Sequence, residues 1–309
     1  MRSMSMGFGA AGMAAAVLAG MVSSAGAQAA PASECEGWHM DTLAQGLGNA
    51  ENLETDGNGG FFVSGLDTHK VYDIDAAGNV SVVLDNFQFG PGGLQRDGRT
   101  LYVMGGMTDG TVGVHALDTA TGAVTHVTDL VGNGLLRLPN GGMLTTWVGT
   151  EGSPSAGVSA YHHDTGVVQP NWSPVPRSEG LALSPDGTTV YTDDLFTGQI
   201  YRIPLDDPGH WTIAGRIGGI VPGDDDLTMT RTGILYVAAH IGGSIDRLNP
   251  ATGATCSIAT GISWGWTGPS SVRIGPDGDG WALYVTAFDG TFRRIRPPAG
   301  VDLTPVQTD

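Results

Sequence analysis

EGLALSPDGTTVY, residues 179–191, decides the fold of this chain because close variants of it recur along the sequence. The phrase consists of a polar anchor residue, a short apolar run, a turn containing glycine and a second β-rich run. Residues 51–63 (ENLETDGNGGFFV) and 225–237 (DDLTMTRTGILYV) repeat it closely. Six copies can be placed, and their anchors stand at positions 51, 92, 133, 179, 225 and 270.

The spacing of the copies predicts an all-β fold, a six-bladed β-propeller of four-stranded blades. The anchors are 41, 41, 46, 46 and 45 residues apart, and a period in the forties with several short strands per copy is typical of propellers. The sixth copy meets Pro297-Pro298 before any outer strand, whereas residues 38–47 form a spare strand ahead of the first anchor. We therefore predict that residues 38–47 complete the last blade and close the ring, which removes two free sheet edges.

The first 27 residues have the pattern of a signal peptide. Arg2 precedes an apolar run over residues 10–22, and Ala25-Gly26-Ala27 resembles a cleavage site. A membrane anchor is the alternative, but the run is short and diluted by glycine. We expect a signal peptide over residues 1–27, one propeller domain over residues 28–309, a secreted or periplasmic location, and no membrane association after cleavage.

The two cysteines, Cys35 and Cys256, are expected to form a disulfide in an oxidising compartment. Cys35 lies just before the predicted closing strand, and Cys256 lies at the start of the outer strand of the fifth copy. A bond between them would hold the closing strand in place. Two unpaired buried thiols are the alternative.

The net charge of −17 makes nucleic acids and anionic membrane surfaces poor partners. A small-molecule substrate remains the expected partner, and the sequence carries no signal for an oligomeric state. The charge is explained either by the solubility of an exported protein or by a field that gathers cations at the axis.

Four anchors are residues that bind metals through oxygen: Glu51, Asn133, Glu179 and Asp225. Equivalent positions of radial blades converge on the central axis, so these side chains should meet at one place. Oxygen donors suit a hard cation, with calcium the first expectation and zinc or manganese as alternatives. Carboxylates in turns that face the solvent are the competing interpretation.

The other two anchors, Gly92 and Ser270, cannot complete a strong site. A cation would then be held from one side and left open to water or substrate, as a catalytic metal requires. Asp226, next to Asp225, would be either a fifth oxygen ligand or a solvated turn residue.

These phrases resemble the gluconolactonase/regucalcin (senescence marker protein) family of six-bladed propellers and, more distantly, the paraoxonases. Glu51 matches the first-blade glutamate of that family, Asn133 its mid-chain asparagine, and Asp225 its metal-binding, proton-handling aspartate. Glu179 departs from the pattern, because the family usually has asparagine before Gly-Leu. The resemblance implies a metal-dependent hydrolase, with an additional negative charge at this site.

Loops between the second and third strands of the copies should lie at the same end of the ring as the anchors. His240 follows such a strand, and we expect it to be a second acid/base group or a substrate contact; a histidine bonded to the backbone is the alternative. The residues expected to line the pocket are His69, Met107, Trp147, Asp194, Phe196, His240 and Phe288.

The leading hypothesis is a metal-dependent lactone or ester hydrolase in which the metal polarises the carbonyl and Asp225 activates water. No Gly-x-Ser-x-Gly motif is present, which argues against an α/β serine hydrolase. Two alternatives stay open. One is a non-catalytic extracellular propeller that binds a ligand or protein, with calcium as a structural plug, and the other is a metal-free enzyme similar to strictosidine synthase.

Overall fold

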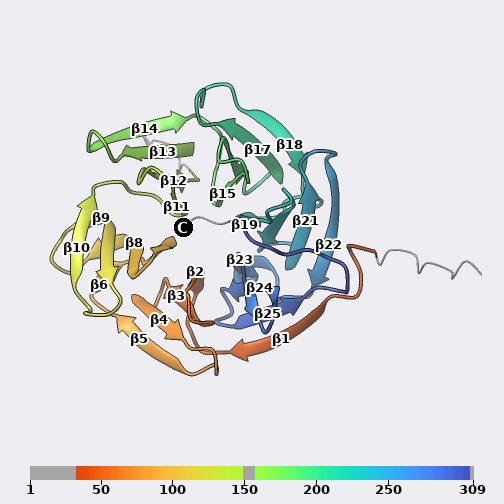
Figure 1. Cartoon of the computed structure of the whole chain (residues 1–309), viewed down its shortest axis with the longest axis horizontal. Helices are drawn as coiled ribbons and strands as arrows, with labels where there is room; N and C mark the ends of the chain where they lie inside the picture. Colours follow the sequence, from red (N-terminus) through yellow and green to blue (C-terminus); the bar gives the residue numbers. More distant parts are fainter. Residues whose placement is uncertain (1–32, 149–156, 307–309) are drawn as a thin grey trace, which may run out of the picture. The chain divides into compact units, whose positions relative to one another are not determined.

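Six β-sheets stand around a central axis in the computed structural model, which describes residues 33–148 and 157–306 (Figure 1). Each sheet is a blade whose first strand lies nearest the axis. The predicted six-bladed propeller is confirmed. The predicted signal peptide lies outside the described residues.

The first three blades follow the chain from the axis outward. Blade 1 contains β2 (Ala50–Thr55), β3 (Phe61–Gly65), β4 (Lys70–Ile74) and β5 (Val80–Leu84); blade 2 contains β7 (Leu94–Asp97), β8 (Thr100–Met107), β9 (Val112–Asp118) and β10 (Val124–Thr128); blade 3 contains β11 (Leu135–Arg137), β12 (Met143–Trp147), β13 (Gly157–His162) and β14 (Val167–Ser173).

The last three blades have the same order, except that the outer strand of blade 6 comes from the other end of the chain. Blade 4 contains β15 (Leu181–Leu183), β16 (Thr189–Asp193), β17 (Gln199–Pro204) and β18 (Thr212–Arg216); blade 5 contains β19 (Asp224–Met229), β20 (Leu235–Ala239), β21 (Ser244–Asn249) and β22 (Ala254–Thr260); blade 6 contains β23 (Pro269–Asp277), β24 (Gly280–Ala287), β25 (Phe292–Arg296) and β1 (His39–Ala44). A single 3₁₀ turn, η1 (Gly265–Thr267), precedes β23 among the described elements.

Blade 2 has a fifth strand that the repeat did not predict. β6 (Phe87–Phe89) pairs with the end of β8, beside β7. Glycines make room for it, because a Cβ atom built on Gly105 would lie 2.8 Å from the Phe87 ring. One on Gly106 would lie even closer to Phe89.

The ring closes as the sequence predicted. β1 pairs antiparallel with β25, with His39 opposite Arg296, and Asp41 accepts a 2.6 Å hydrogen bond from Arg296. Cys35 and Cys256 form a disulfide with a Cα–Cα distance of 6.0 Å. Since Cys256 belongs to β22 and Cys35 precedes β1, the bond joins the outer strand of blade 5 to the segment that leads into the outer strand of blade 6.

The hydrophobic core lies between neighbouring blades. Leu53 and Phe61 of blade 1 pack with Tyr284 and Phe292 of blade 6, and the rings of Phe61 and Tyr284 are 4.1 Å apart. Both faces of each sheet are therefore covered by its neighbours, which explains the continuous apolar runs of the second and third strands. None of the described helical segments has the length and apolar character needed to cross a membrane.

Removal of the disulfide should destabilise the ring. The bond links positions 221 residues apart, so Cys35→Ser with Cys256→Ser should lower the free energy of unfolding by about 2–5 kcal/mol. Denaturant unfolding of the oxidised protein and of the double variant measures the difference. If the two proteins unfold at the same denaturant concentration, β1–β25 pairing alone closes the ring.

Candidate functional site

β-bulges set the direction of three anchors. The pairing of β2 with β3 shifts between Ala50 and Leu53, that of β19 with β20 at Asp225, and that of β23 with β24 at Ser270. A bulge turns a side chain out of the regular alternation of a strand. Glu51 and Asp225 are thereby held at the start of their inner strands, at one end of the axis.

Polar residues on the second strands fix the backbone around the anchors. Ser64 accepts a 2.9 Å hydrogen bond from the N–H of Asn52. The Oδ1 atom of Asp193 accepts from the N–H groups of Glu179 (2.9 Å) and Gly180 (3.0 Å). Sequence reasoning missed these residues, although a small polar residue near the end of the second apolar run in blades 1, 3, 4 and 6 was a usable signal.

The four anchors lie near one another, since Glu51, Asn133 and Glu179 line one pocket and the charges of Glu51 and Glu179 act on Asp225. Three of the four are buried. Glu51, Glu179 and Asp225 are each less than a tenth exposed, and Asn133 is half-buried. The Nδ2 atom of Asn133 donates to Oε2 of Glu179 over 2.7 Å. The Oε2 atom of Glu51 is buried without a hydrogen-bond partner.

Burial and mutual repulsion oppose ionisation of these carboxyl groups. Burial raises the pKa of Glu51 to about 7 and that of Glu179 to about 8, with neighbouring carboxylates contributing in the same direction. The pKa of Asp225 lies well above its ordinary value, first through burial and then through the charges of Glu51 and Glu179. A cation at this place would remove the repulsion.

The donor set fits a hard cation by its chemistry. Its carboxylate and amide oxygens are the donors that such cations prefer, and one of them, Oε2 of Glu51, has no hydrogen-bond partner. Among the described residues, no group of three or more His, Cys, Asp and Glu side chains is arranged to hold a metal ion. The roles of the four anchors as ligands therefore stay predictions.

His240 lies at the end of β20 and reaches Asp225. Its Nδ1 atom is 2.9 Å from Oδ2 of Asp225, and its buried Nε2 atom has no partner. Burial lowers the pKa of His240 to about 4, so the ring is neutral at physiological pH. The rings of Trp266 and Phe288 each lie 5.8 Å from it. His240 therefore adjoins the site, while its chemical role stays a prediction.

The remaining loop residues have different surroundings. Trp147 lines the pocket of the site, as predicted. Met107 and Asp194 do not, and for them the expectation was wrong: Met107 packs in the core between blades 1 and 2, and Asp194 is wholly buried in an ion pair of 2.5 Å with Arg177. His69, Phe196 and Phe288 are not among the residues that line this pocket.

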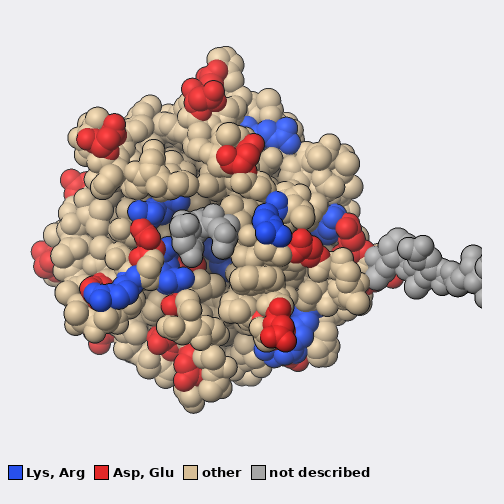
Figure 2. Space-filling view, in the orientation of Figure 1, with Lys and Arg blue, Asp and Glu red and all other residues tan. Residues whose placement is uncertain are grey.

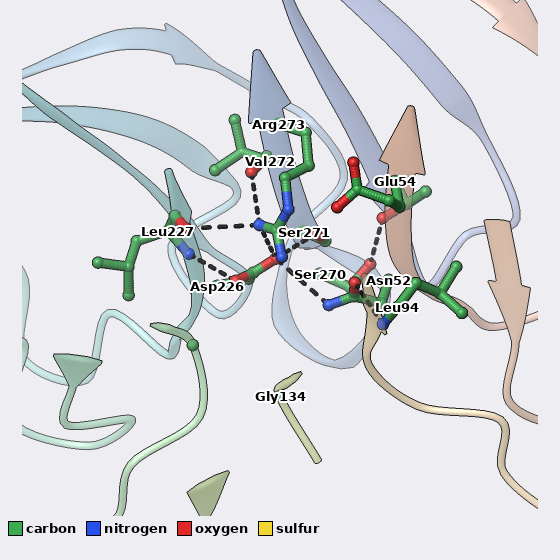
Figure 3. Close-up of polar contacts among 12 residues, drawn as sticks. Asn52, Glu54, Leu94, Gly134, Asp226, Leu227, Ser270, Ser271, Val272 and Arg273 are labelled. Atoms are coloured by element: carbon green, nitrogen blue, oxygen red, sulfur yellow. Dashed lines mark hydrogen bonds and ion pairs between the residues drawn. The ribbon is translucent and has the colours of Figure 1, made fainter. Parts of the chain in front are cut away.

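Asp226 belongs to a network below the site (Figure 3). Its Oδ2 atom accepts hydrogen bonds from Arg273 (2.6 Å), Asn52 (3.3 Å) and Ser271. Asn52 in turn accepts from the N–H of Leu94 over 3.2 Å. Asp226 is thus neither a solvated turn residue nor free to be a ligand, because it ties the inner strands of blades 5, 6 and 1 together.

Of the two anchors without a strong metal ligand, Gly92 and Ser270, only Gly92 borders a pocket that leads to the carboxylates. Gly92 lines a pocket of about 600 Å³ that reaches Glu51, Asn133 and Glu179. Ser270 is buried, and its hydroxyl donates to the carbonyl of Ala50 over 2.5 Å. A substrate would therefore approach the carboxylates from the side of blade 2.

Arg273→Met should destabilise the protein by about 3–5 kcal/mol, because it leaves the buried carboxylate of Asp226 without its ion-pair partner. Chemical unfolding measures the loss. The double variant that combines Arg273→Met with Asp226→Asn has no unpaired buried charge in the network and should recover part of the lost stability. The control is Arg231→Met, since Arg231 is exposed and should contribute within about 0.5 kcal/mol. Equal stability of the two methionine variants would contradict the role of the network.

Residues 111–288 match the sequence model of the SMP-30/Gluconolactonase/LRE-like region. This segment covers more than half of the chain and contains Asn133, Glu179, Asp225 and His240. No curated protein matches the sequence significantly.

Solved structures share the fold. A gluconolactonase from Xanthomonas campestris superposes with a TM-score of 0.70 at 18% identity, covering 88% of this chain and 93% of the other. Regucalcin from Agrobacterium tumefaciens, described as a calcium-binding protein, gives 0.66 at 19%, covering 86% and 96%. A luciferin-regenerating enzyme gives 0.68 at 14%, covering 88% and 100%. At these identities the similarity shows a common architecture.

Proposed function

The chain belongs to the SMP-30/gluconolactonase/LRE-like family, and from this premise we propose that it is a lactonase-type hydrolase that uses a divalent cation. The observation that supports the proposal is that Glu51 and Glu179, from two blades, line the inner end of one pocket, while the buried Asp225 of a third blade lies near enough for their charges to raise its pKa. Buried carboxylates that repel each other are costly without a counter-charge. A site of this kind is retained for chemistry more readily than for stability.

Glu51, Asn133, Glu179 and Asp225 would hold the cation, with calcium as the first choice because a structure of the same fold is described as a calcium-binding protein. When bound, such an ion would polarise a lactone carbonyl and stabilise its oxyanion. The chain contributes the orientation of the ligands: Asp193 fixes the backbone of Glu179, and the amide of Asn133 contacts its carboxylate.

Asp225 is the proposed base. Its Oδ2 atom is engaged by Nδ1 of His240, which leaves Oδ1 to take a proton from the attacking water. His240 orients this carboxylate, and the neighbouring rings of Trp266 and Phe288 keep bulk water away from the pair.

Asp225→Asn tests the base. It keeps an oxygen for the cation but removes the proton acceptor, so lactone turnover should fall about 100-fold or more while much of the metal affinity remains. Glu179→Asn restores the usual ligand of the family and should stay active with weaker metal binding. Rates on a panel of lactones and aryl esters, with calorimetric metal affinities, separate the two effects.

If Asp225→Asn is as fast as the unchanged protein, Asp225 is not the base. If the unchanged protein turns over no lactone or ester, with or without added metal, a binding propeller replaces the hydrolase.

Calcium should raise the melting temperature of chelator-treated protein, because ligand binding to the folded state alone adds about 2.7 kcal/mol at one hundred times the dissociation constant. The double variant Glu51→Gln with Glu179→Gln should melt above the unchanged chelated protein, because the repulsion between the carboxylates is gone. It should gain nothing from calcium, because two of the charged ligands are gone as well. Asp129→Asn, at a side chain that is 90% exposed, is the control and should respond as the unchanged protein does. A melting temperature that does not change when calcium, zinc or manganese is added would contradict the metal site.

A further inference from the structure

The pocket beside the carboxylates is almost entirely apolar. Apart from Glu51, Asn133 and Glu179, the lining residues are glycines or apolar residues: Leu66, Phe89, Gly90, Gly92, Met104, Gly105, Val112, Val131, Gly132, Trp147 and Val148. Its volume of about 600 Å³ is that of a pocket for a small organic molecule.

Apart from Oε2 of Glu51, which has no hydrogen-bond partner and belongs to the proposed ligand set, the following polar groups at its inner end are already engaged. Asn133 bonds to Glu179, and both belong to the proposed ligand set. The backbone N–H of Gly92 donates to Met104 over 2.9 Å, and that of Asn133 donates to Thr146 over 2.8 Å. A substrate with several hydroxyl groups would find few partners on the wall, and each unpaired buried hydroxyl costs about 1–3 kcal/mol.

Large apolar side chains also surround the mouth. Leu66, Phe89, Val131 and Trp147 are 39%, 49%, 45% and 39% exposed, and they come from blades 1, 2 and 3. Phe89 is placed there by β6, the strand outside the repeat, which packs against glycines of β8. Exposed apolar residues gathered at a pocket mark a binding surface more often than isolated ones do.

The other end of the axis has a mixed character. The pocket there, of about 520 Å³, is lined by apolar residues such as Leu181 and Leu227 and by four charged side chains, which are Glu54, Arg96, Arg231 and Arg273. Figure 2 shows one face of the ring with Lys and Arg side chains gathered around its centre. Of these two pockets, only the one at the carboxylate end has a wall without Lys and Arg side chains among the described residues.

We propose that the substrates are lactones or esters with an apolar alkyl or aryl substituent, rather than sugar lactones. The inference rests on the proposed hydrolase function and specifies its substrate class. The carbonyl would lie at the carboxylates and the substituent along Phe89, Val131 and Trp147. Chain length is then the determinant of specificity, and hydroxyl groups on the substituent are unfavourable.

Two measurements test the proposal separately from catalysis. Calorimetry with δ-valerolactams carrying methyl to octyl substituents, whose ring amide resists hydrolysis, should show affinity rising about fourfold per methylene until the pocket is full. The values of kcat/KM for the corresponding δ-lactones should rise in parallel and exceed that of glucono-δ-lactone.

Trp147→Ala should remove most of the gain from chain length while the methyl compound changes little. The matched control is Trp281→Ala, since Trp281 is 38% exposed and lies in the pocket at the other end of the axis. It should leave the whole series unchanged.

Two outcomes separate the substrate class from the reaction. Lactam affinities that rise with chain length without lactone turnover would support the apolar pocket and refute the hydrolase. Faster hydrolysis of glucono-δ-lactone, with lactam affinities that ignore chain length or respond equally to both tryptophan changes, would refute the apolar substrate and leave the hydrolase intact.

Discussion

The close approach of the six inner strands at the axis is the constraint on which the rest of the structure depends. The residue that follows each anchor lies where the inner strands come closest to one another. In blades 2, 3 and 4 it is glycine, and a Cβ atom on Gly93 would lie 2.6 Å from the backbone nitrogen of Leu135. In blades 1, 5 and 6 it is Asn52, Asp226 or Ser271, which bond to one another. In blades 2, 3 and 4 the inner strands therefore approach closely because glycine has no side chain at this position. In blades 1, 5 and 6 they are joined by a network of hydrogen bonds between polar side chains.

This packing decides what the anchors can do. Each anchor comes one residue before the position at which neighbouring inner strands are in closest contact. The backbone is fixed there, so the anchor side chain is directed to the axis whether or not it carries a charge. Asp226 has Arg273 as a partner, whereas Glu51, Glu179 and Asp225 have no ion pair with Lys or Arg among the described residues. The ring is stabilised by its core and network, and that stability maintains a cluster of carboxylates that would not assemble by itself.

The repeat made the blade number, the closing strand and the proximity of the anchors predictable, because all three follow from equivalent positions in a radial array, whereas the role of the anchors as ligands stays a prediction. The partners of Asp226 were not predictable from spacing, since they come from two other blades, blade 1 and blade 6. One signal existed: the residue three after the anchor is polar in Glu54, Gln95, Thr228 and Arg273, although it belongs to an inner strand. The sequence contained no signal for β6, because this strand lies outside the repeat and depends on glycines of another strand.

The asymmetry of the ring also separates the proposed base from the proposed substrate wall. Asp225 and His240 lie in blade 5, covered by aromatic rings from blade 6 and the loop before it. The apolar wall belongs to blades 1, 2 and 3, and its most exposed residue, Phe89, stands on a strand that the propeller does not require. Changes in β6 or at Trp147 can therefore alter the pocket without moving the bulge at Asp225 or the Asp226 network, so under the proposed function the wall can change its substrate while the carboxylates stay in place.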